Sequence, residues 1–287
     1  MKNLLLIILI FAIGLTSCEE FNSDKDQDFL FKIGDDLEYS YADIRLYDSS
    51  THILYFTTNH PEFENCNQCS FSFYVDGDII YQGSFWPSFL CSLPSGVIVS
   101  TCPFFYPAYT LRFEYYGGDE PDSRNDSRII SVLKENGYLH SGISISINSM
   151  EIDGSQLNFS FTVTNMDESD LLILDINKMG PNLFHYFTNG LVIFDLNNTV
   201  VFTSNIEHQA PSPWNTWKID WLSKLKSGQS EQFTIDDTLD APLNPGNYNA
   251  FFEFPGLGFQ VDINELFQDD ARIWLGDVRV TEKLTIL

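Results

Sequence analysis

The fold class of this chain is decided by residues 71–81, FSFYVDGDIIY. Two runs of aromatic and β-branched residues, which favour strands, flank the pair Asp76-Gly77. An Asp-Gly pair between such runs is typical of a β-hairpin, because both central residues of its tight turn have positive φ. The segment therefore predicts two antiparallel strands joined by a two-residue turn.

The same pattern recurs along the chain. Strand-like runs, separated by Gly, Asn, Asp and Pro, occupy residues 53–57, 111–115, 143–147, 157–163, 191–194, 200–202, 233–235, 248–254 and the tail 272–286. Turn signals at intervals of roughly eight to twelve residues are typical of β-sandwiches. We therefore expect an all-β protein with two β-sandwich domains, a β-rich N-terminal domain over residues 29–141 and a second domain over residues 142–287.

Helical structure is expected in few places. Residues 127–136 fit a helix that is capped by Asp126 or Ser127 and ended by Gly137, and they fit a strand equally well. Short helices are expected over residues 262–267 and 214–225.

The composition is that of a folded, strongly acidic protein. Of 287 residues, 44% are hydrophobic and 15% aromatic, which supplies a substantial core. The chain has 40 acidic against 15 basic residues, and removing residues 1–17 removes only Lys2 among them. Such a surface repels phosphate groups, so we exclude nucleic acid as a partner.

The N-terminal sequence predicts the cellular location of the protein. Lys2 precedes an apolar stretch over residues 4–11, which is too short to span a bilayer, and small residues lead to Cys18. This pattern resembles the lipobox of bacterial lipoproteins. The resemblance implies a signal peptide over residues 1–17 and lipidation at Cys18, so that the mature chain is held at the membrane by a lipid anchor.

Residues 18–28 form an acidic tether that resembles the export tag of surface-displayed lipoproteins in the Bacteroidota. This resemblance implies an outer-membrane protein exposed on the cell surface, although a periplasmic position stays open.

Four further cysteines lie in the first half of the chain: Cys66, Cys69, Cys91 and Cys102. An even number outside the cytoplasm predicts two disulfides, with three pairings open. A structural zinc site is the less favoured alternative, because only Cys66 and Cys69 have the close spacing of a zinc-ligand pair.

The second domain carries a family resemblance. Residues 161–165 (FTVTN), the hairpin over 193–202, a following tryptophan, residues 225–230 (LKSGQS) and residues 243–248 (LNPGNY) occur in this order. The order resembles an immunoglobulin-like sandwich, and more narrowly the intracellular proteinase inhibitor family of bacteria. The resemblance implies an immunoglobulin-like fold for residues 142–287, and no inhibitory residue is carried over.

No motif indicates catalysis. The chain contains no Gly-x-Ser-x-Gly nucleophile elbow and no His-Glu-x-x-His zinc motif, so we assign no catalytic residue, metal ligand or cofactor and expect no enzyme activity. Acidic residues crowd two loops, 119–126 and 165–170, where calcium ligands and solvated turn residues are both conceivable. We favour solvated turns, and calcium binding stays open.

Aromatic residues give the binding hypothesis. The candidate ligand-binding residues are Trp214, Trp217, Trp221 and Trp86, which lie in proline-stiffened segments. The first three also fit one helical face, which favours burial. We expect a non-enzymatic binding or assembly module for a protein or a glycan. A proteinase inhibitor-like module is the alternative, and an unrecognised hydrolase is less favoured.

Overall fold

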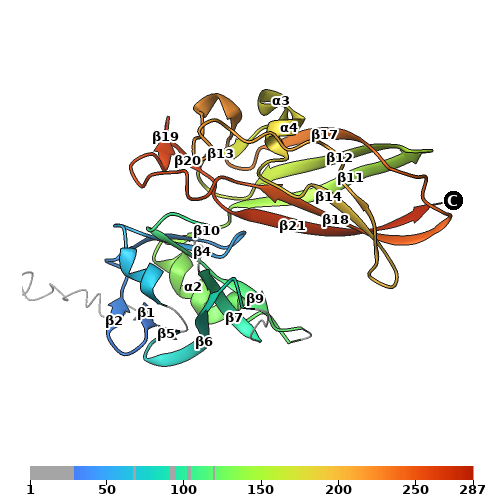
Figure 1. Ribbon diagram of the computed structural model, residues 1–287. Coiled ribbons are helices and arrows are strands. Elements are labelled where there is room, and N and C mark those ends of the chain that lie inside the picture. Colours follow the sequence, from blue (N-terminus) through green and yellow to red (C-terminus); the bar gives the residue numbers. More distant parts are fainter. Residues whose placement is uncertain (1–28, 67–68, 91–94, 102–104, 119, 287) are drawn as a thin grey trace, which may run out of the picture.

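The structure, a computed structural model, describes residues 29–66, 69–90, 95–101, 105–118 and 120–286. Strands make up 49% of it and helices 11%, so the expected β-rich fold is confirmed (Figure 1). The predicted signal peptide, the lipidation site Cys18 and the acidic tether lie outside the described residues.

The N-terminal half contains two sheets and a helix between them. The first has the order β2-β1-β5-β6-β7-β9 and the second β10-β3-β4-β8. Their strands are β1 (Phe29–Ile33), β2 (Leu37–Tyr39), β3 (Ile44–Asp48), β4 (Ile53–Phe56), β5 (Ser70–Val75), β6 (Asp78–Pro87), β7 (Gly96–Thr101), β8 (Thr110–Arg112), β9 (Glu114–Tyr116) and β10 (Leu139–His140). β5 pairs antiparallel with β6, and Asp76 and Gly77 have φ of 53° and 84°, so the predicted hairpin is confirmed.

Residues 127–136 turn out to form a helix, α2 (Ser127–Glu135). The Asp126 carboxylate accepts a hydrogen bond from the Arg128 backbone N–H, which caps the first turn. Gly137, with φ of 75°, follows its end. The helix buries Ile129, Val132 and Leu133 in the N-terminal core, and this burial decides the outcome that local sequence left open.

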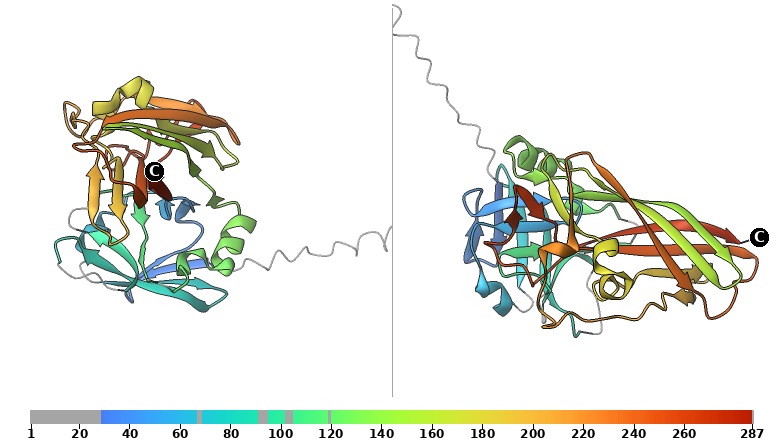
Figure 2. Two further views of the ribbon diagram at one scale, coloured as in Figure 1. Left: turned by 90° about the vertical axis from the view of Figure 1, so that its right-hand side faces the viewer. Right: turned by 90° about the horizontal axis from the view of Figure 1, so that it is seen from above.

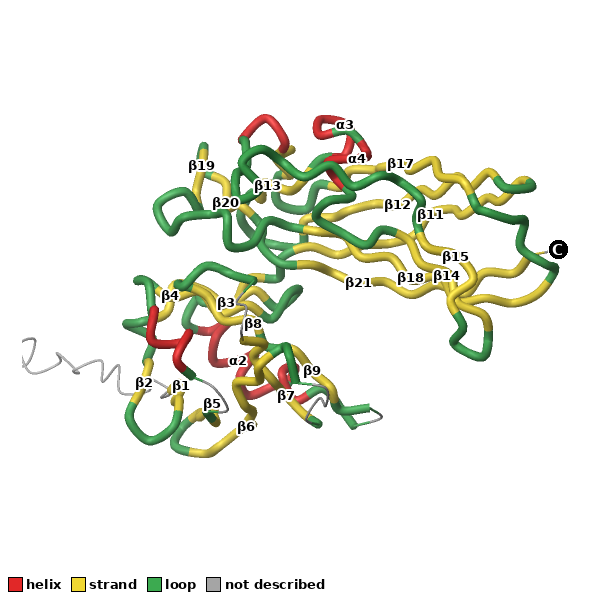
Figure 3. The backbone as a smooth tube through the Cα atoms, viewed as in Figure 1, coloured by secondary structure: helices red, strands yellow, loops and turns green. Residues whose placement is uncertain are grey.

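The C-terminal half contains three sheets, with the orders β11-β12-β17, β16-β13-β20-β19 and β15-β14-β18-β21 (Figure 3). Their strands are β11 (Ile143–Asp153), β12 (Gln156–Asn165), β13 (Leu171–Leu174), β14 (Leu191–Asp195), β15 (Val200–Thr203), β16 (Leu222–Leu225), β17 (Ser230–Thr238), β18 (Gly246–Pro255), β19 (Phe267–Gln268), β20 (Ala271–Ile273) and β21 (Asp277–Ile286). The remaining short helices of the described chain are η1 (Pro61–Asn65), η2 (Ser123–Asn125), α3 (Ile176–Met179), α4 (Pro181–Phe184) and η3 (Ile219–Trp221).

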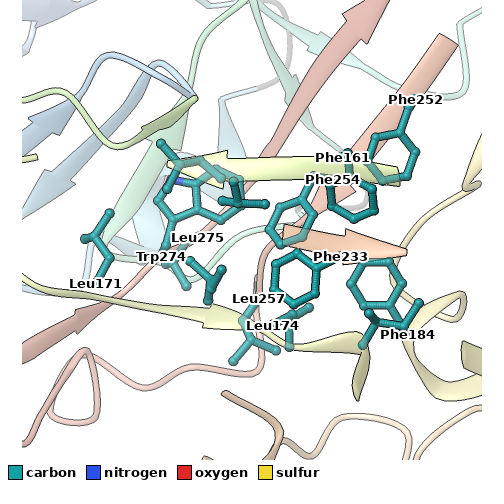
Figure 4. Packing of buried hydrophobic residues seen from close by; sticks show 14 of the residues in the cluster. Phe161, Leu171, Leu174, Phe184, Phe233, Phe252, Phe254, Leu257, Trp274 and Leu275 are labelled. Atoms are coloured by element: carbon teal, nitrogen blue, oxygen red, sulfur yellow. The ribbon is translucent and has the colours of Figure 1, made fainter. Parts of the chain in front are cut away.

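Aromatic side chains fill the C-terminal core (Figure 4). The rings of Phe161 and Phe252 lie 4.6 Å apart between centroids, and Phe254 lies 6.1 Å from Trp274. Each is buried, and complete burial of one such side chain stabilises the fold by about 1.5–3 kcal/mol.

The two halves share one buried sheet. Along β4, Leu54 and Phe56 belong to the N-terminal core, whereas Ile53 and Tyr55 belong to the C-terminal core. Because side chains alternate across a strand, the sheet β10-β3-β4-β8 is covered on both faces. Figure 2 shows this sheet lying between the rest of the N-terminal half and the C-terminal half. The junction of the halves is therefore a packed interface.

Two expected helices are absent. Residues 262–267 form a turn that leads into β19. Within residues 214–225 a single 3₁₀ turn, η3, precedes β16, which pairs with β13. The hydrogen bonds and apolar burial of Leu222 and Leu225 in that sheet outweigh the helical spacing of the tryptophans.

Candidate binding site

The three clustered tryptophans do not share one environment. Trp214 is 61% exposed, whereas Trp221 is 9% exposed and packs 6.3 Å from the ring of Phe187. Trp217 is half-buried against the C-terminal core, and its indole N–H donates to Glu265. The interpretation that these residues share one helical face is wrong, since Trp214 lies in a turn and Trp221 in the separate 3₁₀ turn η3. Of the three, Trp214 is the candidate for ligand contact.

Trp214 belongs to a surface built from three distant segments. Its ring centroid lies 5.3 Å from that of Phe259, and the two planes are inclined by 47°. The backbone N–H of Phe259 donates to the Phe105 carbonyl over 3.1 Å. Phe105 is 54% exposed and Phe259 is also exposed. We call Phe105, Trp214 and Phe259 the aromatic surface.

Close backbone packing holds the aromatic surface in place. A Cβ added to Gly258 would lie 2.8 Å from the Phe105 carbonyl oxygen, so no larger residue fits there without a shift. The Gly258 N–H donates to the side-chain oxygen of Gln260, and the Tyr109 hydroxyl donates to the Val261 carbonyl. The loop that carries Phe259 is thereby fixed against the N-terminal half.

A hollow of about 280 Å³ adjoins the aromatic surface. Phe259 forms part of its wall, and Asn59, Gln260 and Asp262 add polar groups. Asp262 and Asn264 bond to one another beside it, since the Asp262 carboxylate accepts from the Asn264 backbone and amide. The site therefore combines exposed ring faces with hydrogen-bonding groups, which is the usual composition of a small-ligand site.

Trp86 lies elsewhere in the fold. It is half-buried on β6, in register with Ser100 of β7, and its neighbour Phe85 is fully buried. Strand alternation explains the difference between the two neighbours. The structure does not bring Trp86 into the aromatic surface as we have defined it.

Phe259 was missed by sequence reasoning. The signal that marks it is the run Pro255-Gly256-Leu257-Gly258-Phe259, in which an aromatic residue follows two glycines at the end of a strand. Glycines in such a run indicate close approach of backbone segments.

Two residues of the loop over residues 165–170, Asn165 and Asp167, are buried at the junction, so the interpretation of the loop as solvated turn residues is wrong for these two. The Asn165 amide donates to the carbonyls of Ser169 and Leu225. Asp167 accepts from Arg272 over 3.0 Å and bonds to His140 over 2.9 Å. Burial acts to raise the pKa of Asp167, but the hydrogen bond from His140 and the charge of Arg272 hold that pKa well below its usual range.

The other acidic loop is largely occupied by ion pairs. Asp122 binds Arg124 through both carboxylate oxygens, and Asp126 binds Arg128. Among the residues that the structure describes, no group of three or more His, Cys, Asp or Glu is placed to hold a metal ion. Asp119 of this loop lies outside the described residues, so calcium binding that involves Asp119 stays untested.

The prediction of two disulfides can be compared with the structure for only two of the four cysteines. Cys66 and Cys69 are both free thiols, and no disulfide is present in the described ranges. Cys91 and Cys102 lie outside these ranges, so pairings that involve them stay predictions. Burial and the neighbouring Cys69 raise the pKa of the Cys66 thiol to about 12, which suits a structural residue better than a reactive one.

Comparison with known proteins assigns no family. No family model and no curated protein matches the chain. Among solved structures, a structural genomics target named SoR45 is 12% identical with a TM-score of 0.23, over 50% of this chain and 83% of that chain. A β-glucosidase from Listeria innocua in complex with glucose is 13% identical with a TM-score of 0.19, over 50% of this chain and 17% of that one. These distant likenesses carry no argument about function.

Within the described residues, no helix combines the length and apolar character that crossing a membrane requires.

Proposed function

We propose that this protein is a lipid-anchored, non-enzymatic binding module on the outer membrane, exposed at the cell surface, that recognises a glycan through the aromatic surface. In the same proposal, residues 29–141 and 142–287 form two β-sandwich domains, the second immunoglobulin-like. The observation that carries the proposal is the exposed pair of rings, Trp214 and Phe259, beside a polar hollow.

A glycan is favoured over a protein by the size and chemistry of the site. The C–H faces of a sugar ring are apolar and pack on aromatic faces, while the sugar hydroxyls require polar partners such as Asn59 and Asp262. A protein interface of standard size buries about 800 Å² per partner. A hollow of about 280 Å³ with Phe259 in its wall suits one or two sugar units better.

Rigidity also supports ligand binding. The Gly258 contact and the Tyr109 hydrogen bond fix the loop before any ligand arrives, so little conformational entropy is lost on binding. The acidic surface of the chain, with a formal net charge of −25, favours neutral glycans over polyanionic ones.

The test is a glycan screen of the purified protein that begins at residue 19, followed by titration calorimetry of the best neutral oligosaccharide. Trp214→Ala and Phe259→Ala are each expected to weaken binding by at least ~10-fold, because each removes a ring that covers the sugar. Leu196→Ala is the matched control, since Leu196 is 67% exposed on the β14–β15 hairpin. Absence of glycan binding, or equal loss in the control, would overturn the proposal.

A further inference from the structure

A second cavity lies at the junction of the two halves. It has a volume of about 270 Å³, and we call it the junction cleft. Its wall includes Ser50, His52, Arg112, Glu114, Arg124 and Arg279. These residues come from the segment after β3, from β8, β9 and η2, and from β21, so the cleft exists only where both halves meet.

An ion pair across the junction fixes the wall of the cleft. Arg112, on β8, binds both carboxylate oxygens of Asp277, on β21, and the Nη2–Oδ1 distance is 2.8 Å. Both side chains are largely buried. Arg112 also donates to the Tyr106 hydroxyl. A bidentate pair of this kind holds its guanidinium in one orientation.

The carboxylates around the cleft are turned toward its arginines. The oxygens of Asp277 are taken by Arg112, and Oδ1 also lies 3.3 Å from Arg279. Asp122, behind the cleft, uses both oxygens on Arg124. Glu114 accepts from Ser100 and from the Tyr116 hydroxyl through Oε2, and its Oε1 has no hydrogen-bond partner among the described residues. The negative charges are therefore largely satisfied within the wall.

Donor groups remain available. The Arg279 Nε donates to Glu253 over 2.7 Å, whereas neither of its terminal nitrogens has a hydrogen-bond partner in the described part of the chain. The side chain is 57% exposed. Arg124 uses Nε and Nη2 on Asp122 and Nη1 on the Phe113 carbonyl, and each terminal nitrogen carries a second hydrogen. A ligand in the cleft thus meets more donors than acceptors.

The charge distribution of the whole chain makes this cleft unusual. Three of the 15 lysines and arginines lie in its wall, in a protein whose formal net charge is −25. At physiological ionic strength, charges more than about 8 Å away are largely screened, so the charges of the wall itself, three arginines against Glu114 and Asp277, set the potential inside the cleft. We propose that the junction cleft binds the carboxylate of a small ligand, with the free terminal N–H groups of Arg279 as its main donors.

Two sources of that carboxylate fit the chemistry, an acidic sugar unit and a free organic acid. The arrangement of the two sites favours the sugar. A small hollow lined by Phe105, Tyr106, Arg112 and Glu114 shares Arg112 and Glu114 with the cleft, and it shares Phe105 with the aromatic surface. The shared residues make the cleft and the aromatic surface neighbours, as binding of one glycan with an acidic unit to both requires. This preference for the sugar rests on the proposed function, whereas carboxylate binding does not.

The experiment is titration calorimetry of the protein that begins at residue 19 with glucuronate, with lactate as the acyclic carboxylate and with glucose as the uncharged sugar. We expect glucuronate and lactate to bind, and we expect any binding of glucose to be the same in Arg279→Gln and in the wild type. Arg279→Gln should weaken binding of both carboxylates at least ~10-fold, because a charge-assisted hydrogen bond is lost. Arg128→Gln is the matched control, since Arg128 is 55% exposed in an ion pair on α2.

Each outcome is decisive. Binding of either carboxylate that Arg279→Gln weakens and Arg128→Gln does not supports the site. No binding of either carboxylate, or equal binding of the carboxylates to Arg279→Gln and to the wild type, would overturn it. Loss of glucuronate binding in Trp214→Ala with Arg279→Gln unaffected would overturn the cleft and leave the proposed function standing. If the carboxylates bind and no neutral glycan binds in the screen, the junction cleft stands and the proposed function is overturned.

Discussion

Arg272 donates a hydrogen bond of 2.8 Å to Asp48 across 224 residues of sequence, with both side chains fully buried. The same nitrogen reaches Asp167 at 3.0 Å. This ion cluster lies where the shared sheet of the N-terminal half meets the loop after β12, so it joins the two halves at their common core. Two nitrogens of Arg272, Nε and Nη1, have no partner among the described residues.

Replacing Arg272 with Met is expected to destabilise the protein by about 3–5 kcal/mol, because it removes the countercharge of buried Asp48 and leaves buried Asp167 with His140 alone. Urea denaturation monitored by circular dichroism measures the change. Arg128→Met, which breaks the exposed pair with Asp126, should cost at most about 1 kcal/mol. Equal midpoints for the two variants would contradict a structural role for the cluster.

His52 is expected to make the protein less stable as the pH falls. Burial lowers the pKa of His52 to about 3, with help from the charges of Arg124 and Arg112 and against that of Asp122. In the unfolded chain the pKa of His52 is about 6.5. The stability that the neutral form of His52 allows is therefore fully present above pH 6.5 and is lost as the pH falls toward 3.

The free energy of unfolding should therefore fall by up to about 1.4 kcal/mol per pH unit between pH 6 and pH 4 because of His52. The measurement compares wild type with His52→Asn by urea denaturation at several pH values. Asparagine tolerates the positive φ of 54° at this position. Parallel pH profiles of the two proteins would show that His52 is not the group responsible.

Cys66 is expected to resist alkylation. The high pKa of its thiol, caused by burial and by Cys69, leaves little thiolate at pH 8. Iodoacetamide labelling followed by mass spectrometry should modify Cys69, which is partly exposed, well before Cys66. In urea the two rates should converge. If neither residue is labelled unless a reductant is added, the two are in disulfides, contrary to the free thiols described here.

The proposed anchor predicts lipidation at Cys18. Metabolic labelling with a palmitate analogue should give a labelled protein that partitions into detergent, because acyl chains supply the membrane affinity. Cys18→Ala should lose the label and remain in its uncleaved form. Retention of the label in this variant would place the anchor elsewhere.

Sequence reasoning captured local structure better than packing. Asp76-Gly77 and residues 143–163 contain their own turn and alternation signals, and these hairpins are confirmed. Local patterns do not distinguish the helix over residues 127–135 from a strand, because its burial depends on a core that these patterns do not reveal. The run over residues 53–56 is apolar on both faces, but the partner on its second face comes from the other half of the chain.

The candidate site was only half predictable. Trp214 was identified as one of several tryptophans in proline-stiffened segments. Its union with Phe105 depends on Phe259 and on a backbone hydrogen bond between residues 154 positions apart in sequence, which no local pattern reports. The clustering of Arg112, Arg124 and Arg279 around one cleft has the same origin.

The central claim, that a glycan packs on the aromatic surface, is tested most directly by the fluorescence of Trp214. Iodide quenching of the protein that begins at residue 19 should show an accessible fraction that is much smaller in Trp214→Phe, because the other tryptophans are more buried. Saturation with the best neutral oligosaccharide from the screen should protect that fraction in the wild type. If iodide quenches Trp214 equally with and without bound glycan, the ligand does not cover this ring and the account is contradicted.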